Sequence, residues 1–172
     1  MGTAIMEMTA RGDRSAQMRW TGILLGLCLI LHAGCGAARR PAQAGPSPDT
    51  LRIGISRLAL DLIGLPYLYG GEDITGFDCS GFVHYVFSAF GCSVPRTARK
   101  QAAAGRRIQI ARARPGDVVV FKLKGGWHSG VVVGRGVFVH APQSGASIRR
   151  ETLNGFWLRH LKAVVDVLGK GS

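Results

Sequence analysis

Three residues in this sequence could together break an amide bond: Cys79, His128 and His140. A cysteine thiolate is a strong nucleophile, and a histidine can accept the thiol proton and later return it to a leaving group. The cysteine comes first, within Phe77-Asp78-Cys79-Ser80-Gly81-Phe82, and each histidine follows in an apolar segment. One cysteine followed by two such histidines is the arrangement expected of a cysteine hydrolase.

The segment after Cys79 has the pattern of an amphipathic helix. Asp78 suits the N-cap, so Cys79 becomes the first helical residue, where the positive end of the helix dipole favours a thiolate. The carboxylate of Asp78 opposes this effect because it repels a thiolate. The alternative role, an inert buried thiol, fits Cys92 better. The apolar positions recur at spacings of three, one and three residues before a glycine: Val83, Val86, Phe87, Phe90 and Gly91.

Two apolar strands should carry the histidines. His128 begins one run and His140 ends the next, with Gly134-Arg135-Gly136 between the two runs. A three-residue hairpin loop centred on Arg135 would place His128 opposite Pro142, on the same face as His140. A two-residue turn would shift the register by one residue and put the histidines on opposite faces. The pairing of the two histidines therefore depends on the loop.

In these segments and several others, the chain resembles the NlpC family of papain-like cell-wall cysteine endopeptidases. The resemblance covers roughly residues 51–168. Any one segment would be weak support, whereas five in the family's order form a specific signal. The segments are Gly64 to Gly71, Phe77 to Phe82, Val94-Pro95-Arg96-Thr97 with Gln101, Pro115 to Val119, and His128 to Val131, and the hairpin with His140 completes the series.

The resemblance implies a role for each of the three chemical residues. Cys79 would be the nucleophile. His128 would be its general base, and then the acid that protonates the leaving amine. His140 would orient His128 and stabilise its charged form, a position at which many members carry another polar residue.

The same resemblance assigns roles around the nucleophile. Tyr67 matches the tyrosine whose hydroxyl helps to hold the oxyanion, together with the backbone N–H of Cys79. Asp78 and Ser80 match positions that contact the stem peptide in some members. For Tyr67, a core aromatic beside Pro66 is the alternative interpretation.

The predicted fold is a single α+β, papain-like domain spanning residues 51–168. About 120 residues remain after the N-terminal region, enough for one hydrophobic core. Two N-terminal helices, near 51–63 and 79–90, should pack on an antiparallel sheet of about five strands. The expected strands are 117–121, 128–133, 137–141, 146–150 and 161–168.

The N-terminal region has the pattern of an export signal. Three arginines precede an apolar run, 20–31, which is short for a membrane span. Ala33-Gly34-Cys35 resembles a bacterial lipoprotein cleavage site, although His32 departs from that pattern. We therefore expect a signal peptide at 1–34, lipidation of Cys35 and a flexible tether at 35–50, with soluble secretion as the alternative.

The net charge is strongly basic, formally +12. Seven arginines and lysines and no acidic residue occur between Asp78 and Asp117. These basic residues could form a solvated face, or they could attract an anionic polymer. Nucleic acid is not an expected partner, because the chain has an export signal and its basic stretch lacks interleaved aromatic residues. Cell-wall carboxylates or anionic lipid head groups fit better.

These observations predict a peptidoglycan hydrolase, a cysteine endopeptidase that cuts amide bonds in stem peptides or their cross-links through an acyl-enzyme on Cys79. The alternatives are a non-catalytic wall-binding envelope lipoprotein and a related thiol amidase or acyltransferase. No metal ion or other cofactor is expected, because the sequence has no CxxC motif and no paired His/Cys spacing. The expected location is the bacterial cell envelope, either anchored in the membrane and facing the periplasm or secreted, as a monomer.

Overall fold

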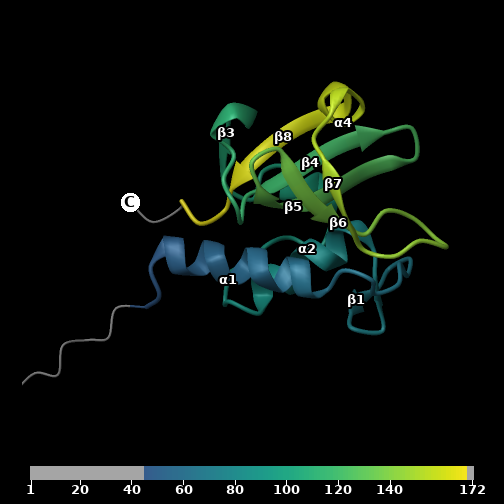
Figure 1. Ribbon diagram of the computed structural model, residues 1–172, viewed down its shortest axis with the longest axis horizontal. Coiled ribbons are helices and arrows are strands. Elements are labelled where there is room, and N and C mark those ends of the chain that lie inside the picture. Colours follow the sequence, from purple (N-terminus) through teal and green to yellow (C-terminus); the bar gives the residue numbers. More distant parts are fainter. Residues whose placement is uncertain (1–44, 170–172) are drawn as a thin grey trace, which may run out of the picture. The chain divides into compact units, whose positions relative to one another are not determined.

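The computed structural model describes residues 45–169. The predictions for the signal peptide at 1–34, for Cys35 and for most of the tether at 35–50 lie outside the described residues. No helix in this part of the chain is long and apolar enough to cross a bilayer. The described residues form a central sheet with helices packed against it (Figure 1).

Helices, strands and one short 3₁₀ turn alternate along the chain. The helices are α1 (Pro48–Asp61), α2 (Cys79–Ser88), α3 (Ala98–Gln101) and α4 (Gly155–His160), and the 3₁₀ turn is η1 (Ile110–Arg112). The strands are β1 (Glu72–Asp73), β2 (Gly76–Phe77), β3 (Arg106–Ile108), β4 (Val118–Leu123), β5 (Gly126–Gly134), β6 (Val137–His140), β7 (Arg149–Thr152) and β8 (Leu161–Asp166).

Local capping determines where the two long helices begin. Ser47 caps α1, its side chain accepting a hydrogen bond from the backbone N–H of Thr50, and Pro48 occupies the first helical position. The helix therefore starts three residues before the expected position, inside the predicted tether. Asp78 caps α2 as predicted, which makes Cys79 the first residue of that helix.

The main sheet has six strands in the order β3-β8-β4-β5-β6-β7, and every pair is antiparallel. The prediction of an α+β, papain-like fold is confirmed. The expected strand count was one too low for this sheet, because β3 at its edge is too short and too basic to show an apolar alternation. Strands β1 and β2 form a separate two-stranded hairpin.

The two faces of the sheet bury two different clusters. Val118 and Val120 of β4 point toward the main core, which also contains Ile55 of α1 and Val83 of α2. The alternate residues of β4 face the second cluster, which contains Trp157 of α4. This period of two follows from strand geometry. Helices α1 and α2 thus cover one face, and α4 covers part of the other (Figure 1).

The β5–β6 hairpin has the predicted register but not the predicted loop. Val131 pairs with Val139 and Val132 with Phe138, as expected. The turn, however, has two residues, because Gly134 pairs with Val137. A register shift between Val132 and Gly134 leaves one extra residue on β5, a β-bulge that compensates for the shorter turn. His128 and His140 therefore stay on the same face.

A buried ionic cluster joins α1 to one end of the sheet. Arg52 binds Asp117 at 2.6 Å and Asp166 at 2.5 Å. All three side chains are at most 6% exposed. Arg52 also donates to the carbonyl of Pro115 at 3.0 Å. The cluster fixes the first turns of α1 against the start of β4 and the end of β8.

Candidate active site

The start of α2 holds Cys79 at the surface of the domain. The backbone N–H of Gly81 donates to the Asp78 carboxylate at 2.7 Å, so the cap is well formed. Gly81 is also required for packing. A Cβ atom there would lie 2.1 Å from the carbonyl oxygen of Gly71, closer than any side chain could tolerate. The helix start therefore packs directly on the backbone of the preceding loop.

Arg96 ties this loop to the cap. Its guanidinium donates to both carboxylate oxygens of Asp78, at 3.0 and 2.8 Å, and to the Ser80 hydroxyl at 3.1 Å. It also pairs with Glu72 at 2.7 Å. Burial alone would raise the pKa of Asp78, but hydrogen bonds from Arg96 and Gly81 outweigh it, and the pKa lies below its ordinary value. Asp78 is therefore held as a carboxylate beside the cysteine.

The two histidines lie side by side against the second cluster. Nε2 of His128 is 2.7 Å from Nδ1 of His140, and both side chains are buried. The indole of Trp157 stacks on His128 with a centroid distance of 5.8 Å and meets His140 edge-on at 5.1 Å. This aromatic packing restricts the orientation of both rings.

Burial keeps both imidazoles neutral. It lowers the pKa of His128 to about 4, with the nearby Asp78 carboxylate acting in the opposite direction. Burial lowers the pKa of His140 to about 3, and the charges of His128 and Arg149 add to that effect. Near neutral pH the pair is uncharged, so His128 can accept a proton.

The strand that carries His128 also contacts Cys79 through the residues on either side of that histidine. The Cys79 sulfur lies 4.0 Å from the carbonyl oxygen of Trp127. The Ser129 hydroxyl donates to the Cys79 carbonyl at 3.4 Å. Among the described contacts, no hydrogen bond joins the sulfur to either imidazole. Active-site hydrogen bonds are often long without substrate and tighten when it binds.

The thiol itself is protonated at rest. Burial raises the pKa of Cys79, and the Asp78 carboxylate adds to the rise, whereas backbone hydrogen bonds from Ser129 and Ser80 oppose it. Desolvation of the thiol therefore has a larger effect on its pKa than the favourable helix dipole expected from the sequence. Cys79 and His128 form a neutral pair from which a thiolate arises only by proton transfer.

Two hollows meet at Cys79 and form a groove. One has a volume of about 460 Å³ and extends past His128 to Phe156. The other, about 410 Å³, extends past Asp78 and Ser80 to Arg99. Both hollows are lined by the same four residues, which mark the centre of the groove: Tyr67, Cys79, Gly125 and Trp127. A peptide chain could therefore pass the sulfur on both sides.

Tyr67 lies at this centre rather than in the interior. It is partly exposed and packs at the edge of the main core, so both interpretations of its role describe part of its surroundings. Burial raises its pKa, and the charges of Cys79 and Asp78 contribute to the rise. Its hydroxyl is therefore a neutral donor near the thiol.

The structure thus brings Tyr67, Asp78, Cys79, Ser80 and His128 to one groove, with Asp78 and Ser80 linked by a 3.1 Å hydrogen bond. His140 is buried beside His128 and does not line the groove. Sequence reasoning missed three contributors. Arg96 was considered part of a basic face, although it lies in a matching segment. Lys124, in the loop between β4 and β5, also lines the groove. Trp157 had no signal, because its contact with His128 depends on how α4 packs.

Comparison with known proteins gives the family. The model of the NlpC/P60 family matches residues 64–166, more than half of the chain. The chain belongs to the NlpC/P60 family. This NlpC/P60 domain contains every predicted catalytic and substrate-binding residue, from Tyr67 to His140.

Characterised members and solved structures are similar over the same region. The chain is 39% identical over 115 residues to a Bacillus subtilis gamma-D-glutamyl-L-lysine dipeptidyl-peptidase, covering 64% of this chain and 37% of that protein. It is 37% identical to a gamma-DL-glutamyl hydrolase of the same species, covering 73% of this chain and 28% of that protein. This chain thus spans well under half of either relative.

Among structures, the NlpC/P60 domain of the peptidoglycan hydrolase SagA matches with a TM-score of 0.60 and 33% identity, covering 67% of this chain and 97% of that one. The peptidoglycan hydrolase RipB of Mycobacterium tuberculosis matches with a TM-score of 0.62 and 26% identity, covering 70% of this chain and 66% of that one. The likeness to SagA extends over nearly the whole of that NlpC/P60 domain.

Proposed function

We propose that this protein is a peptidoglycan endopeptidase whose catalytic residues are Cys79, His128 and His140. The observation that carries the proposal is the groove in an NlpC/P60 domain, where Cys79 at the start of α2 and His128 line one hollow. The buried His128–His140 contact supports the assignment of His140 as the orienting residue. The names of SagA and RipB as peptidoglycan hydrolases support the substrate class.

The neutral pair suggests the order of proton transfers. Cys79 gives its proton to Nδ1 of His128 as the sulfur attacks the amide carbonyl, since Nε2 is bound to His140. The Cys79 N–H and the neutral Tyr67 hydroxyl stabilise the oxyanion. The imidazolium then protonates the leaving amine, and an acyl-enzyme remains on the sulfur. Water, deprotonated by His128, releases the acyl group and restores the thiol.

We further propose an amide of a γ-linked glutamyl residue as the bond that is cut. Both Bacillus subtilis relatives are named for γ-glutamyl bonds. A D,D-cross-link is the competing bond. Asp78 and Ser80 are proposed to contact the stem peptide from the second hollow.

Digestion of purified peptidoglycan, with mass identification of the products, tests the activity and the bond together. The parent should release soluble fragments, and Cys79→Ala should release none while remaining folded. Cys92→Ala is the matched control, because Cys92 is the other free thiol of the described residues and lies outside the groove. Equal activity in Cys79→Ala and the parent would rule out the mechanism. Products cut only at D,D-cross-links would refute the γ-glutamyl assignment.

The location is proposed from the sequence alone. Ala33-Gly34-Cys35 supports lipidation of Cys35 and an envelope lipoprotein. Growth with a palmitate analogue should label the parent and leave Cys35→Ser unlabelled. An unlabelled parent in the soluble envelope fraction would show that no anchor is attached.

A further inference from the structure

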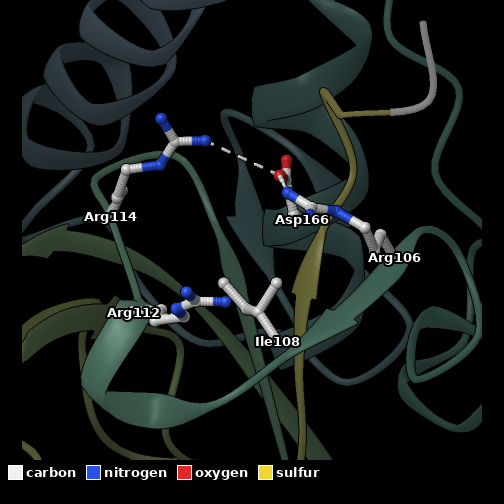
Figure 2. Close-up of a pocket in the computed structure, with 5 residues that line it drawn as sticks. All are labelled: Arg106, Ile108, Arg112, Arg114 and Asp166. Carbon is white, nitrogen blue, oxygen red and sulfur yellow. Dashed lines mark hydrogen bonds and ion pairs between the residues drawn. The ribbon is translucent and has the colours of Figure 1, made fainter. Parts of the chain in front are cut away.

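A third hollow lies away from the groove, at the edge of the main sheet. It has a volume of about 450 Å³ and opens between β3, η1, the segment before β4 and the end of β8. Figure 2 shows the side chains around it, with the guanidinium groups of Arg106 and Arg114 near the Asp166 carboxylate and that of Arg112 beside Ile108. The lining residues are Arg106, Ile108, Arg112, Arg114 and Asp166. We name this the arginine hollow.

The arginine hollow has an excess of positive charge. Asp166 binds Arg52 at 2.5 Å, Arg106 at 3.0 Å and Arg114 at 3.6 Å. Arg112 has no ion pair within the described part of the chain. Counting Asp117, which also binds Arg52, four arginines face two carboxylates, a local net charge of +2.

The single carboxylate of Asp166 binds three arginines and therefore cannot neutralise the charge of all three. Burial would raise its pKa, but the hydrogen bonds from Arg106 and Gly169 and the charge of Arg52 lower it below its ordinary value. One carboxylate is thus shared by several guanidinium groups with five N–H donors each. Arg106 and Arg114 are 64% and 55% exposed, so their remaining donors reach the opening.

Planar guanidinium groups around an open hollow match the oxygen atoms of a phosphate group. Arginine binds phosphate through two parallel N–H bonds, and several arginines can share the charge. A phosphodiester carries one negative charge and a phosphate monoester up to two, which suits a local charge of +2. The class of ligand is therefore a phosphate group.

The position of the hollow indicates where that phosphate would come from. Val118 of β4 pairs with Val165, the neighbour of Asp166. Lys122 pairs with Trp127 at the groove and lies about 13 Å from Val118 along the strand. The hollow and the groove are thus at opposite ends of the sheet. The first turn of α1 lies at the hollow's end, because Arg52 is only four residues after Pro48 (Figure 1). The chain from the apolar run 20–31 and Cys35 enters the domain here.

We propose that the arginine hollow binds the phosphate of an anionic phospholipid head group, so that the domain contacts a membrane surface by the end opposite its groove. This contact leaves the groove open to the cell wall. The proposal adds a second membrane contact to any N-terminal anchor and does not depend on the peptidase assignment. One competing explanation is that the phosphate belongs to a soluble molecule. The other is that the arginines bind no ligand and form a solvated basic face.

The test measures the reaction of single arginines with phenylglyoxal, followed by mass spectrometry. The full chain is bound to vesicles of phosphatidylglycerol or of phosphatidylcholine, so any N-terminal anchor is the same in both samples. Arg112 should react at least about fivefold more slowly on phosphatidylglycerol, the change expected for one arginine near an anionic surface. Arg57 is the control, because it is exposed on α1 and lies outside the hollow. Its rate should change less than twofold.

A variant gives an independent measurement. Arg112→Gln should weaken partition into phosphatidylglycerol vesicles about fivefold, and Arg57→Gln should change it less than twofold. Equal losses in the two variants would overturn the proposal, because general surface charge would then explain the binding. Equal reaction of Arg112 on both vesicles would overturn it as well. Protection of Arg112 by inorganic phosphate alone, without a difference between vesicles, would assign the hollow to a soluble phosphate and refute the lipid contact.

Discussion

Nε2 of His128 lies 2.7 Å from Nδ1 of His140, with the two rings at 88° to each other. If His128 acts as the base, this contact determines which nitrogen of each ring carries its hydrogen. Nδ1 of His128 must be free of hydrogen, so Nε2 carries it and donates to His140. His140 then carries its own hydrogen on Nε2, which is buried and has no hydrogen-bond partner in the structure. His140 is thus an acceptor toward His128 and an unsatisfied donor elsewhere.

The two histidines should therefore differ in their effect on turnover. His128→Ala should lower peptidoglycan turnover by roughly 10²–10⁴-fold, the usual contribution of a general base. His140→Ala removes only the acceptor and should leave a weaker, measurable enzyme. His140→Asn should retain more activity than His140→Ala, because its amide oxygen can accept from His128. Equal turnover in the two His140 variants would contradict the acceptor role.

The neutral resting pair predicts how Cys79 reacts with iodoacetamide. Because burial raises the pKa of this thiol and lowers that of His128 to about 4, the alkylation rate should keep rising as pH increases through 9. The rate is measured in Cys92→Ala, so that Cys79 is the reacting thiol. A flat rate from pH 5 to 8 would instead indicate a resting thiolate–imidazolium pair.

Acid should destabilise the fold through His128. Its pKa is about 4 when folded and about 6.5 when unfolded. The unfolded chain therefore binds the proton first, and stability is complete above pH 6.5 and falls as pH decreases toward 4. Between pH 7 and 4.5 this effect is on the order of 2–3 kcal/mol, measured as the free energy of unfolding in urea. The loss should be smaller in His128→Gln and unchanged in His160→Gln, since His160 lies outside the buried pair.

Arg96 should be required in its own form, not merely as a positive charge. Arg96→Lys keeps the charge but cannot reach Asp78, Glu72 and the loop carbonyls at once. We expect the free energy of unfolding to fall by about 1–3 kcal/mol and KM for the wall substrate to rise, because Asp78 lines the groove. Arg150→Lys, on an exposed residue of β7, is the control. An unchanged KM in Arg96→Lys would contradict the link to the groove.

Arg52 should dominate the stability of the α1 contact. Arg52→Ala leaves the buried carboxylate of Asp117 without its ion-pair partner, a change that typically costs about 3–5 kcal/mol, while Asp166 keeps Arg106 and Arg114. Arg57→Ala, on the exposed side of the same helix, should change stability by less than about 0.5 kcal/mol. Urea unfolding of both variants checks this difference, and similar midpoints would show that the cluster contributes little.

Periodicity and capping predicted most of the elements that carry the groove. The start of α2 followed from one N-cap and a repeat of apolar residues, because both signals are local. The strands of the two histidines were also visible as apolar runs. Edge strand β3 was not, since two of its three residues are exposed arginines.

The remaining features depend on contacts between distant segments. Arg52 meets Asp166 across 114 residues, and Arg96 meets Glu72 across 24. Nothing in the local sequence of Arg52 distinguishes it from the exposed arginines nearby, and the segment that contains Arg96 does not show which acidic residues it binds. The raised pKa of Cys79 was likewise not predictable, because it depends on how deeply the thiol is desolvated. These properties belong to the packed domain.

The β-bulge in β5 has a consequence for how this hairpin can vary among relatives. Deleting one residue from the bulge, or inserting one into the turn at Arg135, would reverse the side on which His140 lies relative to His128. Two such changes made together would restore the pairing. A deletion at the bulge is therefore tolerated only together with an insertion in the turn, which keeps the length of the hairpin, and an alignment that shows a single-residue gap here marks a relative whose two positions no longer meet.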